Sequence, residues 1–320
     1  MPLIEIENVS KRYGSVRALE NVSLRMEGSG IMGLLGQNGA GKTTLINILT
    51  GYLAPTSGRA LLGGHDPLME PGEAKRHLGY LPEQPPLYDE MTVREYLRFV
   101  AALKGVAARA IPAHVDEVME LTGLTSMQSR LLGHLSKGFR QRAGMAQALC
   151  GDPDVLVLDE PTVGLDPRQI TEIRELIRQL GKEHTVILSS HILSEVQQVC
   201  TTILILSKGK LVACDTPENL ERLFAGKSTV ELTVEAAEKE IPGILSGVSH
   251  IVNRTARRRQ DGACDVTLEL DIPAENEVCR EIFFAFSKAG KAILRMTAGK
   301  ASLEDIFMEL TDSGKGEETK

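Results

Sequence analysis

The eight residues from 36 to 43, with the sequence GQNGAGKT, constrain this chain more than any other feature. They follow the apolar run 31–35 and open the helical pattern 44–49, which is the strand–loop–helix context that a phosphate-binding loop requires. The glycines let backbone N–H groups turn toward phosphate oxygens, and the helix N-terminus adds its positive dipole end. Lys42 can reach the terminal phosphates, and the Thr43 hydroxyl can ligate Mg²⁺. The predicted nucleotide contacts are Gly36, Asn38, Gly39, Ala40, Gly41, Lys42, Thr43 and Thr44.

The composition is that of an ordinary globular protein with more than one core. A length of 320 residues favours two domains. Hydrophobic residues make up 42% and charged residues 25% of the chain, which is typical of globular proteins in water. The formal net charge of −7 argues against a general nucleic-acid binder, whose surface is normally basic.

Several features concern the cellular compartment. The first residues lack the pattern of a secretory signal, and no apolar run approaches the roughly 20 residues that a membrane-spanning helix needs. We therefore expect that the chain does not enter a bilayer by itself. The five cysteines are widely spaced and predict buried, reduced thiols rather than disulfides or a zinc site. They are Cys150, Cys200, Cys214, Cys264 and Cys279.

The order of apolar patterns predicts an α/β domain over residues 1–225. Strands are expected at 3–8 and 18–26, and a hairpin-like segment at 58–64. Apolar residues recur at helical spacing between 92 and 150, which predicts a helical subdomain inserted into the domain. Later strands are almost continuously apolar, which favours a mostly parallel sheet covered on both faces.

The pattern changes after residue 225 and predicts a second, smaller α+β domain over 226–311. Residues 229–234 and 265–271 alternate between apolar and polar side chains, as half-buried strands do. The expected order is β-α-β-β-α-β-α, with the last helix at 302–310, and it resembles a ferredoxin-like plait. The polar residues 312–320 are expected to form a disordered tail.

Two adjacent carboxylates end one of the buried strands of the first domain. The run 155–158 is wholly apolar and leads into Asp159 and Glu160. Ligand sites of α/β sheets lie at the carboxyl ends of the strands, so Asp159 is placed to hold Mg²⁺ near the phosphate loop. Glu160 lies one residue further out, where it could deprotonate an attacking water.

A further motif makes a family resemblance specific. Residues 135–142 read LSKGFRQR and resemble the signature loop of ABC-type ATPases, which usually reads LSGGQ. Lys137 and Phe139 depart from that pattern, whereas Ser136 and Gly138 match it. The variant is similar to that of bacterial ABC-2-type exporter ATPases. The C-terminal third resembles, more weakly, the accessory domain of such proteins, including the sequence LEDIF at 303–307.

The resemblance assigns roles to other residues. Tyr13 matches the aromatic residue that stacks on adenine, and Asp166 lies in a VGLDP sequence that matches the loop linking the two subunits' active sites. His191 matches the switch histidine that contacts the γ-phosphate. The family's glutamine that contacts Mg²⁺ and water aligns with Glu83, while Gln84 could take that role after a backbone shift. We favour Glu83.

The resemblance implies that the chain is an ATPase subunit that drives a transporter, and one alternative function remains open. It implies ATP and Mg²⁺ as cofactors, a homodimer in which the signature loop acts on the partner copy, and separate integral membrane permease subunits. The protein would then be cytoplasmic and peripheral on the inner face of the membrane, with no nucleic acid bound. The alternative is a soluble ABC ATPase that acts on nucleic acid or ribosomes. The implied catalytic residues are Glu160, His191, Lys42 and Glu83, and the implied metal ligands are Thr43, Asp159 and Glu83.

Overall fold

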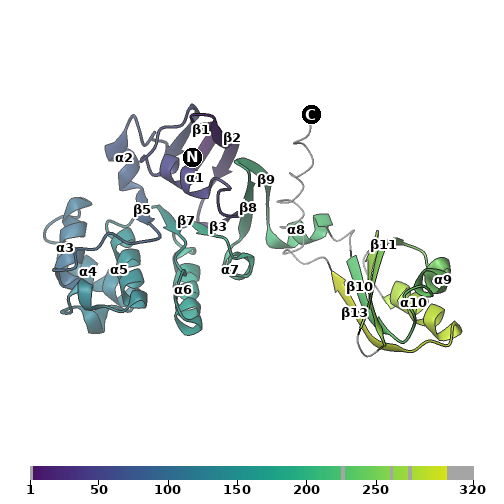
Figure 1. Ribbon diagram of the computed structural model, residues 1–320. Coiled ribbons are helices and arrows are strands. Elements are labelled where there is room, and N and C mark those ends of the chain that lie inside the picture. The colour runs from purple at the N-terminus through teal and green to yellow at the C-terminus, as the bar shows by residue number, and fades with distance from the viewer. Residues whose placement is uncertain (1–2, 225–227, 260–261, 273–275, 301–320) are drawn as a thin grey trace. The chain divides into compact units, whose positions relative to one another are not determined.

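The computed structural model describes residues 3–224, 228–259, 262–272 and 276–300 (Figure 1). The chain forms two compact units, Met1–Thr216 and Pro217–Lys320. Helix α8 (Pro217–Phe224) therefore belongs to the second unit, although the sequence prediction places it in the first domain. The predictions for 302–310 and 312–320 lie outside the described residues.

A six-stranded sheet forms the centre of the first unit, in the order β5-β6-β7-β3-β8-β9. Its first five strands are parallel and β9 is antiparallel to β8, which confirms the prediction of a mostly parallel sheet. Every residue of β6 and β7 is buried, because helices cover a parallel sheet on both faces. The strands are β3 (Gly30–Leu35), β5 (Leu78–Leu81), β6 (Val155–Asp159), β7 (Thr185–Ser190), β8 (Thr202–Ser207) and β9 (Lys210–Asp215). The helices directly connected to them are α1 (Lys42–Leu49), α6 (Pro167–Leu180) and α7 (Leu193–Val199).

A second, antiparallel sheet covers α1, with the order β2-β1-β4. Strand β1 (Ile4–Tyr13) pairs with both β2 (Val16–Met26) and β4 (Ser57–Leu62). The sequence predicts a strand at 3–8, whereas β1 continues to Tyr13. At Asn8 φ is 49° and the pairing register with β2 shifts. This irregularity interrupts the alternation of apolar and polar residues, although the strand continues. The predicted hairpin-like segment forms strand β4, which pairs with β1, followed by a tight turn in which Leu62 and His65 exchange two backbone hydrogen bonds.

The inserted region is helical, as predicted. It contains α3 (Val93–Leu103), α4 (Ile111–Leu121) and α5 (Lys137–Leu149), which lie together in Figure 1. Short 3₁₀ turns at Thr125–Met127 and Leu132–His134 connect α4 to α5, and α2 (Pro71–Arg76) precedes β5. Helix α5 packs closely on β5, because a Cβ added at Gly79 would lie 2.1 Å from the carbonyl oxygen of Ala148.

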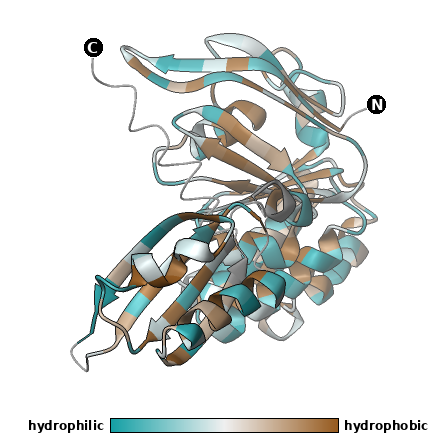
Figure 2. Cartoon of the chain, turned by 90° about the vertical axis from the view of Figure 1, so that its right-hand side faces the viewer, coloured by the Kyte–Doolittle hydropathy of each residue, from teal (hydrophilic) through white to brown (hydrophobic). Residues whose placement is uncertain are grey.

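The second unit contains an antiparallel sheet in the order β11-β12-β10-β13. Its elements are β10 (Ser228–Val234), α9 (Ile241–Ile244), β11 (Ile251–Arg258), β12 (Cys264–Leu270), α10 (Asn276–Lys288) and β13 (Ile293–Lys300). This is the predicted β-α-β-β-α-β order, with the first strand between the third and the fourth as in a ferredoxin-like plait. Ile282 and Phe286 of α10 pack with the inward-facing strand residues. Figure 2 colours the whole chain by hydropathy, and its helices carry both hydrophobic and hydrophilic residues.

Two sequence predictions on compartment can be compared with the structure. Over the described ranges, no helix has both the length and the apolar character needed to cross a membrane. All five cysteines are free thiols, and Cys150, Cys200 and Cys264 are buried. The prediction that all are buried is wrong for Cys279, which is only partly buried, and for Cys214. Cys214 is exposed because β9 is an edge strand with residues that alternate toward solvent.

Candidate active site

The loop from 36 to 41 connects β3 to α1 at the carboxyl end of the parallel sheet, and two glycines fix its path. A Cβ at Gly36 would lie 2.7 Å from the carbonyl oxygen of Leu206. Gly41 caps α1 with φ at 109°, a conformation that L side chains rarely adopt, and a Cβ there would lie 2.7 Å from the carbonyl oxygen of Ala18. The first N–H groups of α1 have no intrahelical acceptors and so can bind an anion.

Lys42 is the first residue of α1, and only 7% of its surface is exposed. Its Nζ donates a hydrogen bond of 2.7 Å to the carbonyl oxygen of Gly36 and lies 3.9 Å from Oε1 of Glu160. Burial lowers the pKa of Lys42, while the carboxylates of Glu160 and Asp159 oppose that shift. The loop therefore holds an amine in a confined place where a phosphate would compensate its charge.

Asp159 ends β6 and is also 7% exposed. The hydroxyl of Ser189, on the neighbouring strand β7, donates a hydrogen bond of 2.5 Å to Oδ1 of Asp159. Burial raises the pKa of Asp159, the Ser189 hydrogen bond opposes this, the nearby Glu83 adds to it, and Lys42 opposes it. A carboxylate crowded by burial and by a second carboxylate favours binding of a cation.

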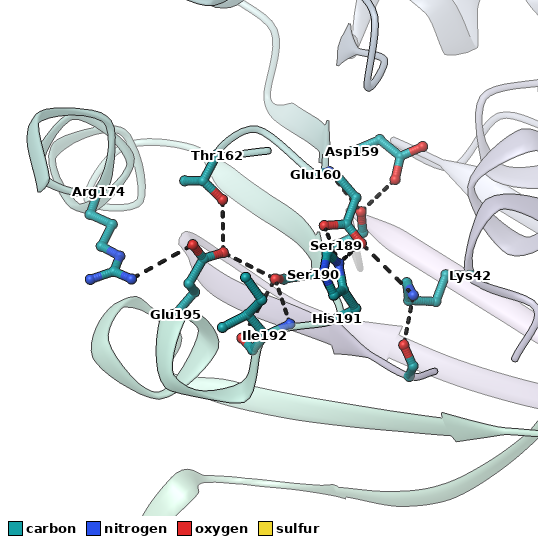
Figure 3. A network of polar contacts seen from close by, with 11 residues as sticks. Lys42, Asp159, Glu160, Thr162, Arg174, Ser189, Ser190, His191, Ile192 and Glu195 are labelled. Carbon is teal, nitrogen blue, oxygen red and sulfur yellow. Dashed lines mark hydrogen bonds and ion pairs between the residues drawn. The ribbon is translucent and has the colours of Figure 1, made fainter. Parts of the chain in front are cut away.

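Glu160 follows with φ at 49°, which is uncommon for a residue with a side chain and costs about 1 kcal/mol or more. Two contacts to β7 fix this conformation, since the N–H of Glu160 donates to the carbonyl oxygen and to Oγ of Ser189, at 3.3 and 3.0 Å. Nδ1 of His191 lies 3.0 and 2.9 Å from the two carboxylate oxygens of Glu160 (Figure 3). The structure thus brings together the predicted base and the predicted switch histidine.

Lys42, Asp159 and Glu160 line a cavity of about 340 Å³ at the phosphate loop. Glu83 lines this cavity, whereas the exposed side chain of Gln84 is not among its described lining residues. This placement favours Glu83, as the sequence does, for the predicted contact with Mg²⁺ and the attacking water. The cavity is lined by Ala18, Gln37, Asn38, Gly39, Gly41, Lys42, Thr43, Thr44, Glu83, Asp159 and Glu160.

The predicted adenine contact lies on β1. Tyr13 is 48% exposed, so its ring presents a large apolar surface to solvent. Nζ of Lys11 lies 5.4 Å from the ring centroid and also donates a hydrogen bond of 2.7 Å to the carbonyl oxygen of Ala54. Because Lys11 is tied to that carbonyl, its contact with the ring restrains the orientation of Tyr13.

The first turns of α5 and α6 lie close together within one chain. Ser136 is the N-cap of α5 and accepts a hydrogen bond from the N–H of Phe139, and Asp166 caps α6 in the same way through Gln169. A Cβ at Gly138 would lie 2.8 to 3.0 Å from side-chain atoms of Gln169. Within the described residues, the predicted nucleotide contacts Ser136, Gly138 and Asp166 do not line the phosphate cavity.

Sequence reasoning missed Ser189, which binds both Asp159 and Glu160, and the buried Glu195 on α7. The only available signal for Ser189 was a polar residue at the carboxyl end of a buried strand, where sites of α/β proteins lie. No pattern in the sequence indicates that Glu195 lies beside this end of the sheet.

Comparison with known proteins places this geometry in a family. The ABC transporter family model matches residues 19–163. The bacitracin transport ATP-binding protein BcrA of Bacillus licheniformis is 33% identical to this chain, over 98% of each protein. The chain belongs to the ABC transporter ATP-binding proteins. The linearmycin resistance ATP-binding protein LnrL of Bacillus subtilis is 29% identical, over 97% of this chain and 98% of that protein. A solved ATP-binding subunit of an ABC transporter superposes with a TM-score of 0.64 and 30% identity, over 69% of this chain and 93% of that one.

The family membership confirms several predictions. An ABC transporter ATP-binding protein binds and hydrolyses ATP, and its fold is that of a P-loop NTPase. The resemblance read from residues 135–142 is confirmed by relatives that match nearly the whole chain. The roles of the individual site residues stay predictions. Of the predicted catalytic and metal-binding residues, Lys42, Thr43, Glu83, Asp159 and Glu160 line one cavity.

Proposed function

We propose that this protein is the ATPase subunit of an ABC-2-type exporter, acting as a homodimer on separate integral membrane subunits at the cytoplasmic face of the membrane. The observation that carries this proposal is that, within one chain, the signature loop lies apart from the phosphate cavity. Residues of the phosphate loop line one cavity together with Asp159 and Glu160. Within the described residues, Ser136 and Gly138 do not line that cavity, and Gly138 lies beside Gln169 of α6 instead. Relatives named for bacitracin transport and linearmycin resistance support export of a small molecule.

Under this proposal, three side chains of the cavity would hold Mg²⁺. Thr43, Glu83 and Asp159 line it together and offer oxygen donors, which Mg²⁺ prefers. In the described part of the chain, no three His, Cys, Asp or Glu side chains form a group that could enclose a metal. This suits an ion that keeps several waters and takes further ligands from nucleotide phosphates. The bound ion would neutralise charge that develops on the transferring phosphoryl group.

The neighbouring side chains have distinct roles in hydrolysis under this proposal. Lys42, already in the loop, compensates the charge of the terminal phosphates. Glu160 accepts a proton from the attacking water as the water forms its bond to phosphorus. Nδ1 of His191 lies within hydrogen-bond distance of the Glu160 carboxylate, so this contact orients the imidazole ring beside the proposed base.

A second copy would complete the site. Each chain has one phosphate loop and one signature loop, so two chains arranged head to tail bring Ser136 and Gly138 of one copy to the nucleotide of the other. Asp166 is the N-cap of α6, whose first turn lies beside Gly138, and it would lie at the same contact between the two copies. ATP then favours the closed dimer because both copies bind its γ-phosphate, and hydrolysis removes that shared contact.

A groove beside the helical region suits the membrane subunit. It has a volume of about 640 Å³ and lies among α2, α3 and the start of β5. Tyr52 is 78% exposed there, which is a large apolar surface to leave in water. Its aromatic residues are Tyr52, Tyr80, Tyr88, Tyr96 and Phe99, and its basic residues are Lys75, Arg76 and Lys104. A short amphipathic helix with acidic residues at its edge would match both.

Affinity purification from native membranes tests the proposal. Tagged Glu160→Gln protein, solubilised with Mg-ATP, should retain an integral membrane protein of several spans. Tyr88→Ser with Phe99→Ser should lose that protein while ATP binding persists. Phe284→Ser provides the matched control, because Phe284 is exposed on α10 in the other unit. Recovery of ribosomes or nucleic acid in place of a membrane protein would instead favour the soluble ABC ATPase.

A further inference from the structure

Glu195 is a buried carboxylate that the proposed mechanism does not use. It lies on α7, which directly follows the His191 segment, and only 5% of its surface is exposed. An isolated ionised carboxylate is costly to bury, so its contacts must compensate that cost. Three of these contacts come from three different elements around the candidate active site (Figure 3).

Two of the contacts are hydrogen bonds to the same oxygen. Oγ1 of Thr162 donates to Oε2 of Glu195 at 2.7 Å, and Oγ of Ser190 donates to it at 3.1 Å. Both donors are themselves buried, with 6% and 1% exposure. The third contact is an ion pair, in which a terminal nitrogen of Arg174 on α6 lies 3.7 Å from Oε1. The carboxylate is therefore bound on both oxygens.

The two hydroxyl donors occupy informative positions in the chain. Thr162 lies two residues after Glu160, and Ser190 directly precedes His191. Oγ of Ser190 also accepts a hydrogen bond of 3.0 Å from the N–H of Ile192, which shapes the turn on the other side of His191. A single carboxylate thus joins the segment of the candidate base to the segment of the candidate switch histidine.

The backbone at Glu160 depends on such restraint. Its left-handed conformation is held on one side by Ser189, and on the other side the chain is tied down two residues later by Thr162. The carboxylate of Glu160 and the ring of His191 meet at hydrogen-bond distance, so small shifts of either segment would separate them.

We propose that Glu195 is a positioning residue for ATP hydrolysis, which fixes the Glu160 and His191 segments in one arrangement through Thr162 and Ser190. This inference rests on the proposed function, in which Glu160 and His191 serve hydrolysis. Glu195 is not a lining residue of the phosphate cavity within the described chain. It should therefore influence the rate of hydrolysis and leave the affinity for ATP almost unchanged.

Steady-state ATPase rates and ATP affinities of full-length variants test this inference. Glu195→Ala should lower kcat at least tenfold and change the Kd for ATP less than threefold. Glu195→Gln keeps one acceptor oxygen and should recover part of the rate. Glu175→Ala is the control, since it also removes a glutamate ion pair of this region, but from a side chain that is 74% exposed. The control should retain the wild-type rate.

A double-mutant cycle separates positioning from general stability. Thr162→Val and Ser190→Ala each remove one hydrogen bond to Glu195, and their effects on kcat should be strongly non-additive with Glu195→Ala. Additive effects, equal losses in kcat and ATP affinity, or an unchanged kcat in folded Glu195→Ala would overturn the inference. If Glu195→Ala does not fold, wild-type rates in Glu195→Gln and Thr162→Val overturn it instead. A wild-type protein without ATPase activity would contradict the proposed function as well.

Discussion

Nδ1 of His191 and the carboxylate of Glu160 lie within 3.0 Å of each other, although 31 residues separate them in the chain. Glu160 follows strand β6, and His191 follows β7, its parallel neighbour in the sheet. Parallel pairing brings the carboxyl ends of both strands to one edge, so the relationship depends on the sheet and not on local sequence. Several expected outcomes follow from this arrangement and from the packing around it.

Glu160→Gln should abolish most of the hydrolysis without weakening ATP binding. The amide keeps the size of the side chain but cannot accept a proton from water, so we expect a loss of roughly 10²–10⁴-fold in kcat. ATP affinity and ATPase rate, measured on the same preparation, check this. Glu183→Gln, at an exposed position, is the control. Near-normal turnover in Glu160→Gln would exclude Glu160 as the base.

Lys42→Met should weaken ATP binding at least tenfold. Methionine can occupy the space of the buried lysine stem, but it removes the positive charge that lies in the phosphate loop. Equilibrium binding of a fluorescent ATP analogue would measure the change, with Lys182→Met as an exposed control. Unchanged affinity would show that the backbone of the loop binds the phosphates without this side chain.

Tyr13→Ala should weaken ATP binding by about 1–3 kcal/mol, the usual value of stacking between a base and an aromatic ring. Tyr13→Trp should bind ATP about as well as the wild type, because it preserves an aromatic face. Comparing ATP with inorganic triphosphate isolates the contribution of the base. If Tyr13→Ala weakens both ligands equally, the ring does not stack on adenine.

Gly79→Ala should destabilise the first unit by about 2 kcal/mol or more, because the added methyl group would overlap the backbone of α5. Gly72→Ala is the matched control. A Cβ there meets no atom within 4 Å, and alanine in helix α2 should stabilise the protein by about 0.5–1 kcal/mol. Urea unfolding of both variants would measure the difference, and equal stability would contradict the close packing of β5 on α5.

Cys150 and Cys200 should resist alkylation in the folded protein. Burial raises the pKa of each thiol to about 12, so at pH 8 only about one molecule in ten thousand carries the reactive thiolate. Labelling of both residues should increase in urea, where the pKa returns toward its ordinary value near 8.5. Mass spectrometry of tryptic peptides can measure this, and rapid labelling of either cysteine in the native protein would contradict its burial.

Much of the active site could be predicted from sequence because its parts are local. The phosphate loop is a single segment of eight residues, and its glycines are visible in the sequence at the spacing of the motif. The backbone atoms that approach Gly36 and Gly41 belong to the distant residues Leu206 and Ala18. Asp159 and Glu160 were identified because a strand end is visible as the end of an apolar run. The strands β1 and β4 were predicted less well, since bulges interrupt the alternation that reveals a strand.

The sequence alone therefore determined the P-loop α/β class, the family, the phosphate site and the change to an α+β unit. Only the tertiary structure decided which side chains meet. The contacts of Ser189 and Glu195 depended on the neighbouring positions of β6, β7 and α7. The physical reason is that periodicity records which face of an element is buried, whereas the order of strands in a sheet sets which distant residues become neighbours.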